Sequence, residues 1–275
     1  MPSAEETALQ LVLATAPQFG AVAVVADSVN TLNLRLDVPL ASGATHPFHL
    51  RVECSGFQIR VFEREPRMLP GFCVERHIND GGSFCLSWSQ DGPLQIRDEA
   101  AAVEFWSQMV RFLEHQIAAS KLGRWPGTEH ARAHGEAAEP QERAEAAARA
   151  LGPKVHRDLL HGDLLVRAVT KGRKRRLELW RRGRRVARVH VSTGTLVSLN
   201  LPCICDPTAH QRVPVGSCGD HAKQVAALIS NAHERHRLER EYIEHLRGAK
   251  KACCGTLKKC GLRERNPQME PRRTR

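Results

Sequence analysis

The charge of the chain changes sign part of the way along it. Residues 1–150 hold 13 basic and 19 acidic side chains, whereas residues 151–275 hold 28 basic and 11 acidic ones. A chain of 275 residues is long enough for two domains that each bury a core of their own. The sequence therefore predicts two domains with different partners.

The nine cysteines are as unevenly spread as the charge, with three in the first half and six between residues 203 and 260. The N-terminal stretch carries acids before a short apolar run, which is not typical of a secretory signal. No apolar segment reaches the length of about 18 residues that a membrane span needs. We therefore expect a cytoplasmic protein with no membrane contact, whose reduced thiols serve metal binding or catalysis.

The first half reads as an α+β domain. Ser3 is a plausible N-cap for a helix over residues 4–15, with Glu5 and Glu6 in its first turn. A second amphipathic helix is expected over residues 97–119. Between them, β-branched or alternating runs predict a four-stranded antiparallel meander over residues 21–29, 32–40, 46–54 and 57–64.

The stretch from Pro66 to Trp88 carries the most distinctive chemistry, because a cysteine follows a short polar turn. Cys85 comes after a pair of glycines, and Asn79 and His77 lie just upstream. A thiolate can take an acyl group and hand it to an amine, and a carboxamide can donate to the oxyanion that forms. The pattern favours a thiol acyltransferase, although a buried cysteine in such a segment is also commonly a small apolar residue.

This segment, HINDGGSFCL, resembles the active-site signature of ubiquitin-conjugating enzymes, and most closely that of their divergent bacterial branch. The resemblance implies the ubiquitin-conjugating (UBC) fold, with Cys85 as the thioester cysteine, Asn79 as the oxyanion donor and His77 as a structural histidine of the loop. It also implies a ubiquitin-like protein and its activating enzyme as partners, with no small-molecule cofactor required. Ile78 stands where the family has proline, and the interval from Asn79 to Cys85 is shorter than usual.

The resemblance extends over residues 1–135. We expect a solvated helical linker over residues 136–152, because this segment is rich in alanine and charge. A small basic cysteine-rich α+β domain is predicted over residues 153–265, followed by a disordered tail over residues 266–275. Its expected elements are strands over residues 161–170, 175–181 and 184–192, the last two joined by Arg182–Gly183 as a hairpin turn, and a long helix over residues 221–247.

Ten basic residues lie between Lys171 and Arg188, with Trp180 among them. Such a run on a hairpin can follow a phosphate backbone while the indole stacks on a base, so nucleic acid is a possible partner. It can equally be a charged strand edge or a surface for an acidic protein.

The cysteines of the second half suggest a metal site. Thiolates at both ends of one long helix can converge if the chain folds back, and zinc is the usual ion for such a set. Structural cysteines without a metal, or a redox pair, are the other possibilities. In its combination of parts the chain is similar to bacterial conjugating-enzyme-like proteins with a cysteine-rich C-terminal region. The proposed ligands are Cys203, Cys205, Cys218, Cys253, Cys254 and Cys260.

Two alternative functions follow from the same residues. In the first, the chain is a catalytically inert binding module with the same fold, whose basic cysteine-rich half binds protein or nucleic acid. In the second, it is a thiol protease in which His130 or His134 serves Cys85 as a base. These two histidines are four residues apart and could also form a metal pair, although surface histidines are the simpler interpretation.

Overall fold

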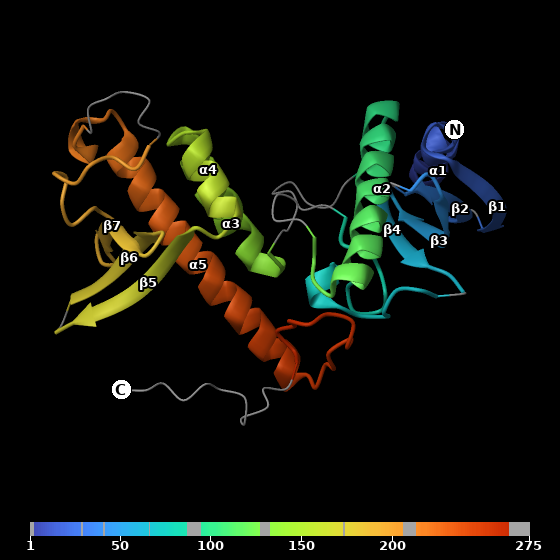
Figure 1. Ribbon diagram of the computed structural model, residues 1–275. Helices are drawn as coiled ribbons and strands as arrows, with labels where there is room; N and C mark the ends of the chain where they lie inside the picture. The colour runs from blue at the N-terminus through green and yellow to red at the C-terminus, as the bar shows by residue number, and fades with distance from the viewer. Residues whose placement is uncertain are drawn as a thin grey trace. The chain divides into compact units, whose positions relative to one another are not determined.

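The computed structural model describes residues 3–28, 30–40, 42–65, 67–86, 95–126, 133–172, 174–205 and 213–263. The tail expected over residues 266–275 lies outside this set. The chain divides into two compact units, of which the first is built from two separate segments of the sequence and the second from one (Figure 1). Unit 1 joins Met1–Pro126 to Lys250–Arg275, and unit 2 is Gly127–Ala249.

Unit 1 is an antiparallel sheet with two helices on one of its faces. Helix α1 (Ala4–Thr15) has the capping box that Ser3 predicts, in which Ser3 Oγ accepts from the Glu6 N–H and Glu6 reaches back to the Ser3 N–H. The sheet has the strand order β1-β2-β3-β4, so the predicted meander is confirmed. Its strands are β1 (Ala21–Ser28), β2 (Thr31–Pro39), β3 (Thr45–Ser55) and β4 (Gln58–Glu63), and α2 (Glu99–Leu122) follows the irregular segment.

The core of unit 1 follows from the alternation in β2 and β3. Leu34 pairs with Leu50 and Leu36 with Phe48, so these side chains share one face of the sheet, and all four are buried. They pack against α1 and α2 in one apolar cluster. The Trp106 indole N–H on α2 donates to the Val12 carbonyl on α1 at 3.0 Å, which satisfies its polar atom in the core.

Unit 2 packs two helices and a three-stranded sheet against a long helix. Its strands β5 (Leu164–Lys171), β6 (Lys174–Arg181) and β7 (Arg184–His190) pair antiparallel in this order. The predicted turn between β6 and β7 is confirmed, with both Arg182 and Gly183 at positive φ. The helices are α3 (Ala138–Ala150), α4 (Pro153–Leu160) and α5 (His221–Gly248).

Helix α3 is part of unit 2 and is not exposed on all sides. Its alanines at 144, 147 and 148 are buried and join an apolar cluster with α5 and the sheet. Small side chains let two helix backbones approach closely, which gives the alanine-rich sequence a packing role. Within the described part of the chain, no helix is both long and apolar enough to cross a membrane.

Candidate functional site

The Cys85 segment forms a small hairpin on unit 1. Ile78 and Phe84 face each other as an antiparallel bridge, flanked by two backbone hydrogen bonds. The Asn79 N–H donates to the Ser83 carbonyl, and the Cys85 N–H donates to the His77 carbonyl, both at 2.8 Å. The turn needs Gly81 and Gly82, because both have φ near +87°.

This pairing decides which side chains share a face. Ile78 and Phe84 are buried in the core of unit 1. Successive residues of a strand point to opposite sides, so the neighbours of this pair are directed to the other face. Asn79 and Cys85 are diagonal neighbours there, a relation that corresponds to about 7–8 Å. The pairing therefore puts Asn79 and Cys85 on neighbouring strands of one hairpin.

The Cys85 thiol is half-buried and forms no disulfide. Burial raises its pKa above the ordinary value, because removal from water disfavours the thiolate. None of the described residues forms a hydrogen bond with its sulfur. The thiol therefore has no paired base in the described part of the chain, in contrast to the arrangement typical of a thiol protease.

Asn79 and His77 occupy different environments. Asn79 is exposed, and its side-chain amide donates to Ser83 Oγ at 3.2 Å, so it can turn toward a bound group. His77 is buried and has a left-handed backbone conformation with φ of 55°. Its ring centroid lies 5.1 Å from that of Trp125. The structure thus holds His77 inside the protein beneath the hairpin.

A buried arginine supports the hairpin from below. Arg76 is 1% exposed, and its guanidinium donates to Gln116 Oε1 at 2.7 Å, to the Gln116 carbonyl at 3.0 Å and to Ser120 Oγ at 3.0 Å. The Gln116 amide donates back to the Arg76 carbonyl at 2.6 Å. This network fixes the short helix η2 (Val74–Arg76) to α2, immediately before His77.

A polar hollow of about 340 Å³ lies beside the glycine turn. Strands β3 and β4 contribute Arg51 and Phe62, and the following loop contributes Arg67. Glu63 orders that loop, since its carboxylate accepts from the backbone N–H groups of Met68 and Leu69 at 3.0 and 2.7 Å. Gly81 and Gly82 form part of the lining of the hollow.

Unit 2 contains a compact group of metal-ligating side chains. The Sγ atoms of Cys203 and Cys218 each lie 3.2 Å from His221 Nδ1. With Cys205 they form the only group of three or more described Cys, His, Asp or Glu side chains whose ligand atoms all lie within 4.8 Å of one another. Burial, together with the sulfurs of Cys203 and Cys218, raises the pKa of Cys205 to about 12.

Three sulfurs and one imidazole nitrogen are a donor set that suits tetrahedral zinc. A bound cation would counteract the repulsion from the sulfurs of Cys203 and Cys218, which contributes to the raised pKa of Cys205. The cluster is therefore compatible with zinc binding.

The six predicted ligands fall into two groups. Cys203, Cys205 and Cys218 lie in unit 2, whereas Cys253, Cys254 and Cys260 lie in the returning segment of unit 1. The fourth member of the first group, His221, is absent from the predicted ligand set. Its spacing of three residues from Cys218, at the start of α5, is the signal that identifies it.

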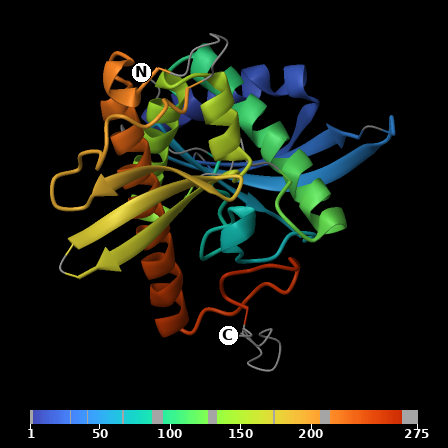
Figure 2. The ribbon, with the colours of Figure 1, turned by 60° about the vertical axis from the view of Figure 1, so that its left-hand side comes forward.

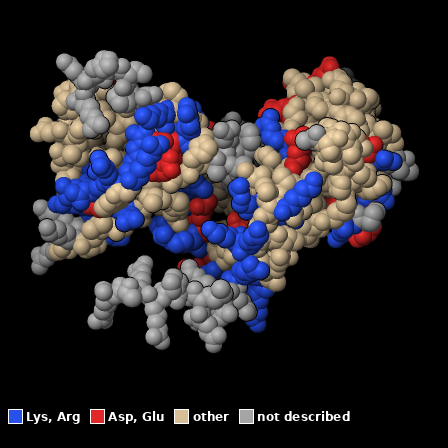
Figure 3. Space-filling view, in the orientation of Figure 1, with Lys and Arg blue, Asp and Glu red and all other residues tan. Residues whose placement is uncertain are grey.

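Figure 3 shows a concentration of Lys and Arg on unit 2, over the part that contains the three-stranded sheet. The Trp180 ring is not free for stacking on both faces, because the Arg167 guanidinium lies 5.0 Å from its centroid. Its indole N–H donates to Glu178 at 3.2 Å. Several guanidiniums remain exposed around it, namely those of Arg175, Arg182, Arg184 and Arg185.

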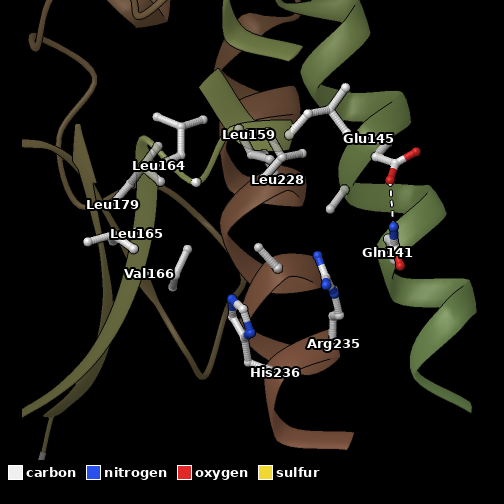
Figure 4. Close-up of a pocket in the computed structure, with 14 residues that line it drawn as sticks. Gln141, Glu145, Leu159, Leu164, Leu165, Val166, Leu179, Leu228, Arg235 and His236 are labelled. Atoms are coloured by element: carbon white, nitrogen blue, oxygen red, sulfur yellow. Dashed lines mark hydrogen bonds between the residues drawn. The ribbon is translucent and has the colours of Figure 1, made fainter. Parts of the chain in front are cut away.

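Unit 2 also has a pocket of about 260 Å³ between α3, α4, β5 and α5 (Figure 4). Leucines from α4, β5 and α5 line one end, and Arg235 and His236 of α5 lie at the other. On the α3 side, the Gln141 amide donates to Glu145 at 2.8 Å. A pocket of this size can hold one apolar group next to the Arg235 guanidinium.

The histidine pair considered for metal binding or as a base is only partly described. His130 lies outside the described residues. The His134 ring stacks on the Tyr242 ring of α5, with the centroids 5.6 Å apart and the planes at 5°. His134 thus has a packing role within unit 2.

Comparison with protein families gives two matches. Residues 21–127 match a model described as a prokaryotic E2 domain, and residues 133–262 match one described as a cysteine-rich domain, C-terminal to E2 domain. E2 denotes the ubiquitin-conjugating enzyme. No curated protein and no solved structure matches the chain. The chain therefore combines an E2-like domain with a cysteine-rich C-terminal domain, as the sequence predicts.

Proposed function

We propose that this chain carries a ubiquitin-like protein as a thioester on Cys85 and transfers it to an amine. The main support is the hairpin geometry, which places an unpaired thiol and the exposed Asn79 carboxamide on one face. The match of residues 21–127 to the prokaryotic E2 domain supports a conjugating function. E2 domains in general work with a ubiquitin-like modifier and its activating enzyme, so we infer these as partners.

The reaction has two acyl transfers. In the first, the Cys85 thiolate attacks the thioester carbonyl on the activating enzyme, the new C–S bond forms, and the enzyme's thiolate leaves. In the second, an amine attacks the Cys85 thioester, the C–S bond breaks, an amide forms, and the amine proton passes to solvent. Asn79 would donate its side-chain N–H to the oxyanion of the tetrahedral intermediate. His77 would hold the hairpin through the hydrogen bond between its carbonyl and the Cys85 N–H.

The hollow beside Gly81 and Gly82 would hold the C-terminal tail of the modifier. A narrow extended tail suits a site whose floor is the backbone of two glycines. Arg51, Arg64 and Arg67 around the hollow can bind its carbonyl oxygens or acidic side chains.

Within unit 2, we infer that Cys203, Cys205, Cys218 and His221 bind a structural zinc ion. The ion would stabilise the loops that precede α5, and a closed set of four protein ligands leaves no position for a substrate.

A second candidate function is a binding module with an inert Cys85. The observation that favours it is the exposed basic surface of unit 2, which suits an acidic protein or nucleic acid. A nucleic-acid complex would weaken steeply as salt is raised. The two functions therefore give different results in a charging assay and in a salt titration.

The charging assay tests the proposal directly. The protein is incubated with an activating enzyme, a ubiquitin-like modifier and ATP, and is then run on non-reducing gels with and without thiol. We expect a thiol-labile adduct in the wild type, a thiol-resistant ester in Cys85→Ser and none in Cys85→Ala. A folded protein that forms no adduct with its cognate pair would favour the binding module.

A further inference from the structure

The last described segment, residues 250–263, returns to unit 1 after α5 and packs beside η2 (Figures 1 and 2). Three polar contacts hold it there. Lys251 Nζ lies 2.6 Å from Asp80 Oδ2, the Gly261 N–H donates to Glu75 Oε1 at 2.8 Å, and the Lys258 N–H donates to the Gly123 carbonyl at 2.7 Å. The contacts span both ends of the segment, so it is fixed along its length.

This packing gathers four thiols from distant parts of the sequence. Cys254 Sγ lies 3.0 Å from Cys73 Sγ. Cys253 directly precedes Cys254, and the N–H of Gly261, next to Cys260, donates to Glu75 Oε1, two residues from Cys73, at 2.8 Å. All four cysteines belong to unit 1. Cys73 is absent from the predicted ligand set, and it lies 181 residues before Cys254 in the sequence.

Two of these sulfurs also have a hydrogen-bonding neighbour in the returning segment. The Gly255 N–H donates to Cys253 Sγ at 3.4 Å, and Cys254 Sγ lies 3.1 Å from Thr256 Oγ1. Neighbouring groups of this kind orient sulfurs as metal ligands.

A buried cation lies next to these sulfurs. The Arg76 guanidinium interacts electrostatically with Cys73 and Cys254, and it donates to Thr256 Oγ1 at 3.2 Å. Four thiolates around a divalent cation carry a net charge of two minus, so an adjacent guanidinium lowers the cost of holding them in a partly buried place.

We propose that Cys73, Cys253, Cys254 and Cys260 bind one zinc ion as four thiolates, separately from the Cys203 group. Zinc is favoured because an all-sulfur tetrahedral set is its usual structural site. On binding, four S–H bonds lose their protons to solvent and four Zn–S bonds form, with no change in oxidation state. Zn–S bonds of about 2.3 Å in a tetrahedral set would place the sulfurs about 3.8 Å from one another. The Cys73 and Cys254 sulfurs, now 3.0 Å apart, would move slightly apart, and the four sulfurs, which do not all lie within 4.8 Å of one another, would form a more compact set.

The site would act on the hairpin that carries Cys85. Cys73 and Ile78 exchange two backbone hydrogen bonds, both of 3.0 Å, and Ile78 faces Phe84. A metal bound to Cys73 would therefore fix the hairpin at its base. The proposal does not depend on whether Cys85 carries a thioester.

The test is the metal content of the full chain, measured by elemental analysis after gel filtration. We expect two zinc ions per chain in the wild type. Cys73→Ser and Cys253→Ser should each lose one, and Cys218→Ser should lose the other. The matched control is Cys54→Ala, which removes a buried cysteine outside both groups and should retain two. Circular dichroism establishes that Cys73→Ser, Cys253→Ser and Cys54→Ala are folded, whereas unit 2 of Cys218→Ser is expected to unfold as it loses its ion.

Several results would overturn the proposal. One is a folded Cys73→Ser chain with the zinc content of the wild type, and another is iron in place of zinc. If the variants do not fold, alkylation of the wild type decides the question. Cys73, Cys253, Cys254 and Cys260 should be protected together and become reactive on chelation, whereas a disulfide between Cys73 and Cys254 with no second ion would contradict a metal site.

Discussion

Cys85 and the Cys203 group show two opposite environments of cysteine in one chain. The Cys85 sulfur has no hydrogen bond within the described residues, whereas the sulfurs of Cys203 and Cys218 share the imidazole of His221 at 3.2 Å. An isolated thiol on a hairpin keeps its sulfur available for reaction, and clustered thiols satisfy one another or a metal. The environment of each sulfur, not the residue type, therefore indicates its role.

Cys54 provides a third case. It is buried in the core of unit 1, and its thiol donates to the Gly56 carbonyl at 3.1 Å. Burial and the nearby charge of Glu5 raise its pKa to about 11. It behaves as a small apolar residue and makes a suitable control for both other kinds of site.

The largest expected effect concerns the Cys203 group. Loss of a structural zinc site removes a binding free energy of about 10 kcal/mol or more, so Cys218→Ser should unfold unit 2 at room temperature. Thermal unfolding followed by circular dichroism, with and without chelator, measures this. Cys85→Ser should unfold as the wild type does. If Cys218→Ser were as stable as the wild type, the Cys203 group would not stabilise unit 2, and its contrast with Cys85 would be lost.

The next effect concerns the support of the Cys85 hairpin. Arg76→Met leaves Gln116 and Ser120 without their buried donor, which should lower the free energy of unfolding of unit 1 by about 3 kcal/mol. Urea unfolding measures the loss. The control Arg60→Met alters an exposed arginine on β4 and should change stability little. If both variants unfold alike, the Arg76 network does not hold the hairpin.

A smaller effect is expected on the reaction itself. Asn79→Ala should slow transfer from the Cys85 thioester to an amine by about 100-fold, because an oxyanion donor is lost. Formation of the thioester should be affected less. Single-turnover discharge measures the rate, and Asn200→Ala, at an exposed position in unit 2, is the control. An unchanged discharge rate would show that Asn79 does not contribute to catalysis at Cys85.

The smallest effect is on the pH dependence of Cys85. Burial raises its pKa, so at any given pH below that value less of it is thiolate than of an ordinary cysteine. Its alkylation rate should therefore increase at higher pH in the folded chain than in the same chain in urea. Mass spectrometry of the Cys85 peptide measures both profiles. A folded profile at lower pH than the unfolded one would indicate an activating partner for the thiol.

Local patterns in the sequence were sufficient for most of the fold. The alternation of Leu34 and Leu36 with polar residues predicted a one-sided sheet, and Ser3 and Glu6 predicted the start of α1. The Arg182–Gly183 turn was equally visible, because positive φ favours glycine. These features depend on neighbours only a few residues away.

The candidate sites depended on contacts that a local pattern does not contain. The approach of Cys254 to Cys73 joins positions separated by 181 residues, and it requires the chain to return to unit 1 after α5. The common face of Asn79 and Cys85 required the pairing of Ile78 with Phe84. Likewise, the alanine-rich sequence of α3 predicts a solvated linker, and the burial of these alanines against α5 is visible only in the structure.

The most direct test of the central claim is to locate the thioester by peptide mapping of the charged protein. Free thiols are blocked with one reagent, the thioester is cleaved with hydroxylamine, and the released thiol is labelled with a second reagent. We predict that the second label appears on Cys85 and on none of the clustered cysteines. A label on a member of either cysteine group, or on no cysteine of a folded and active preparation, would contradict the account.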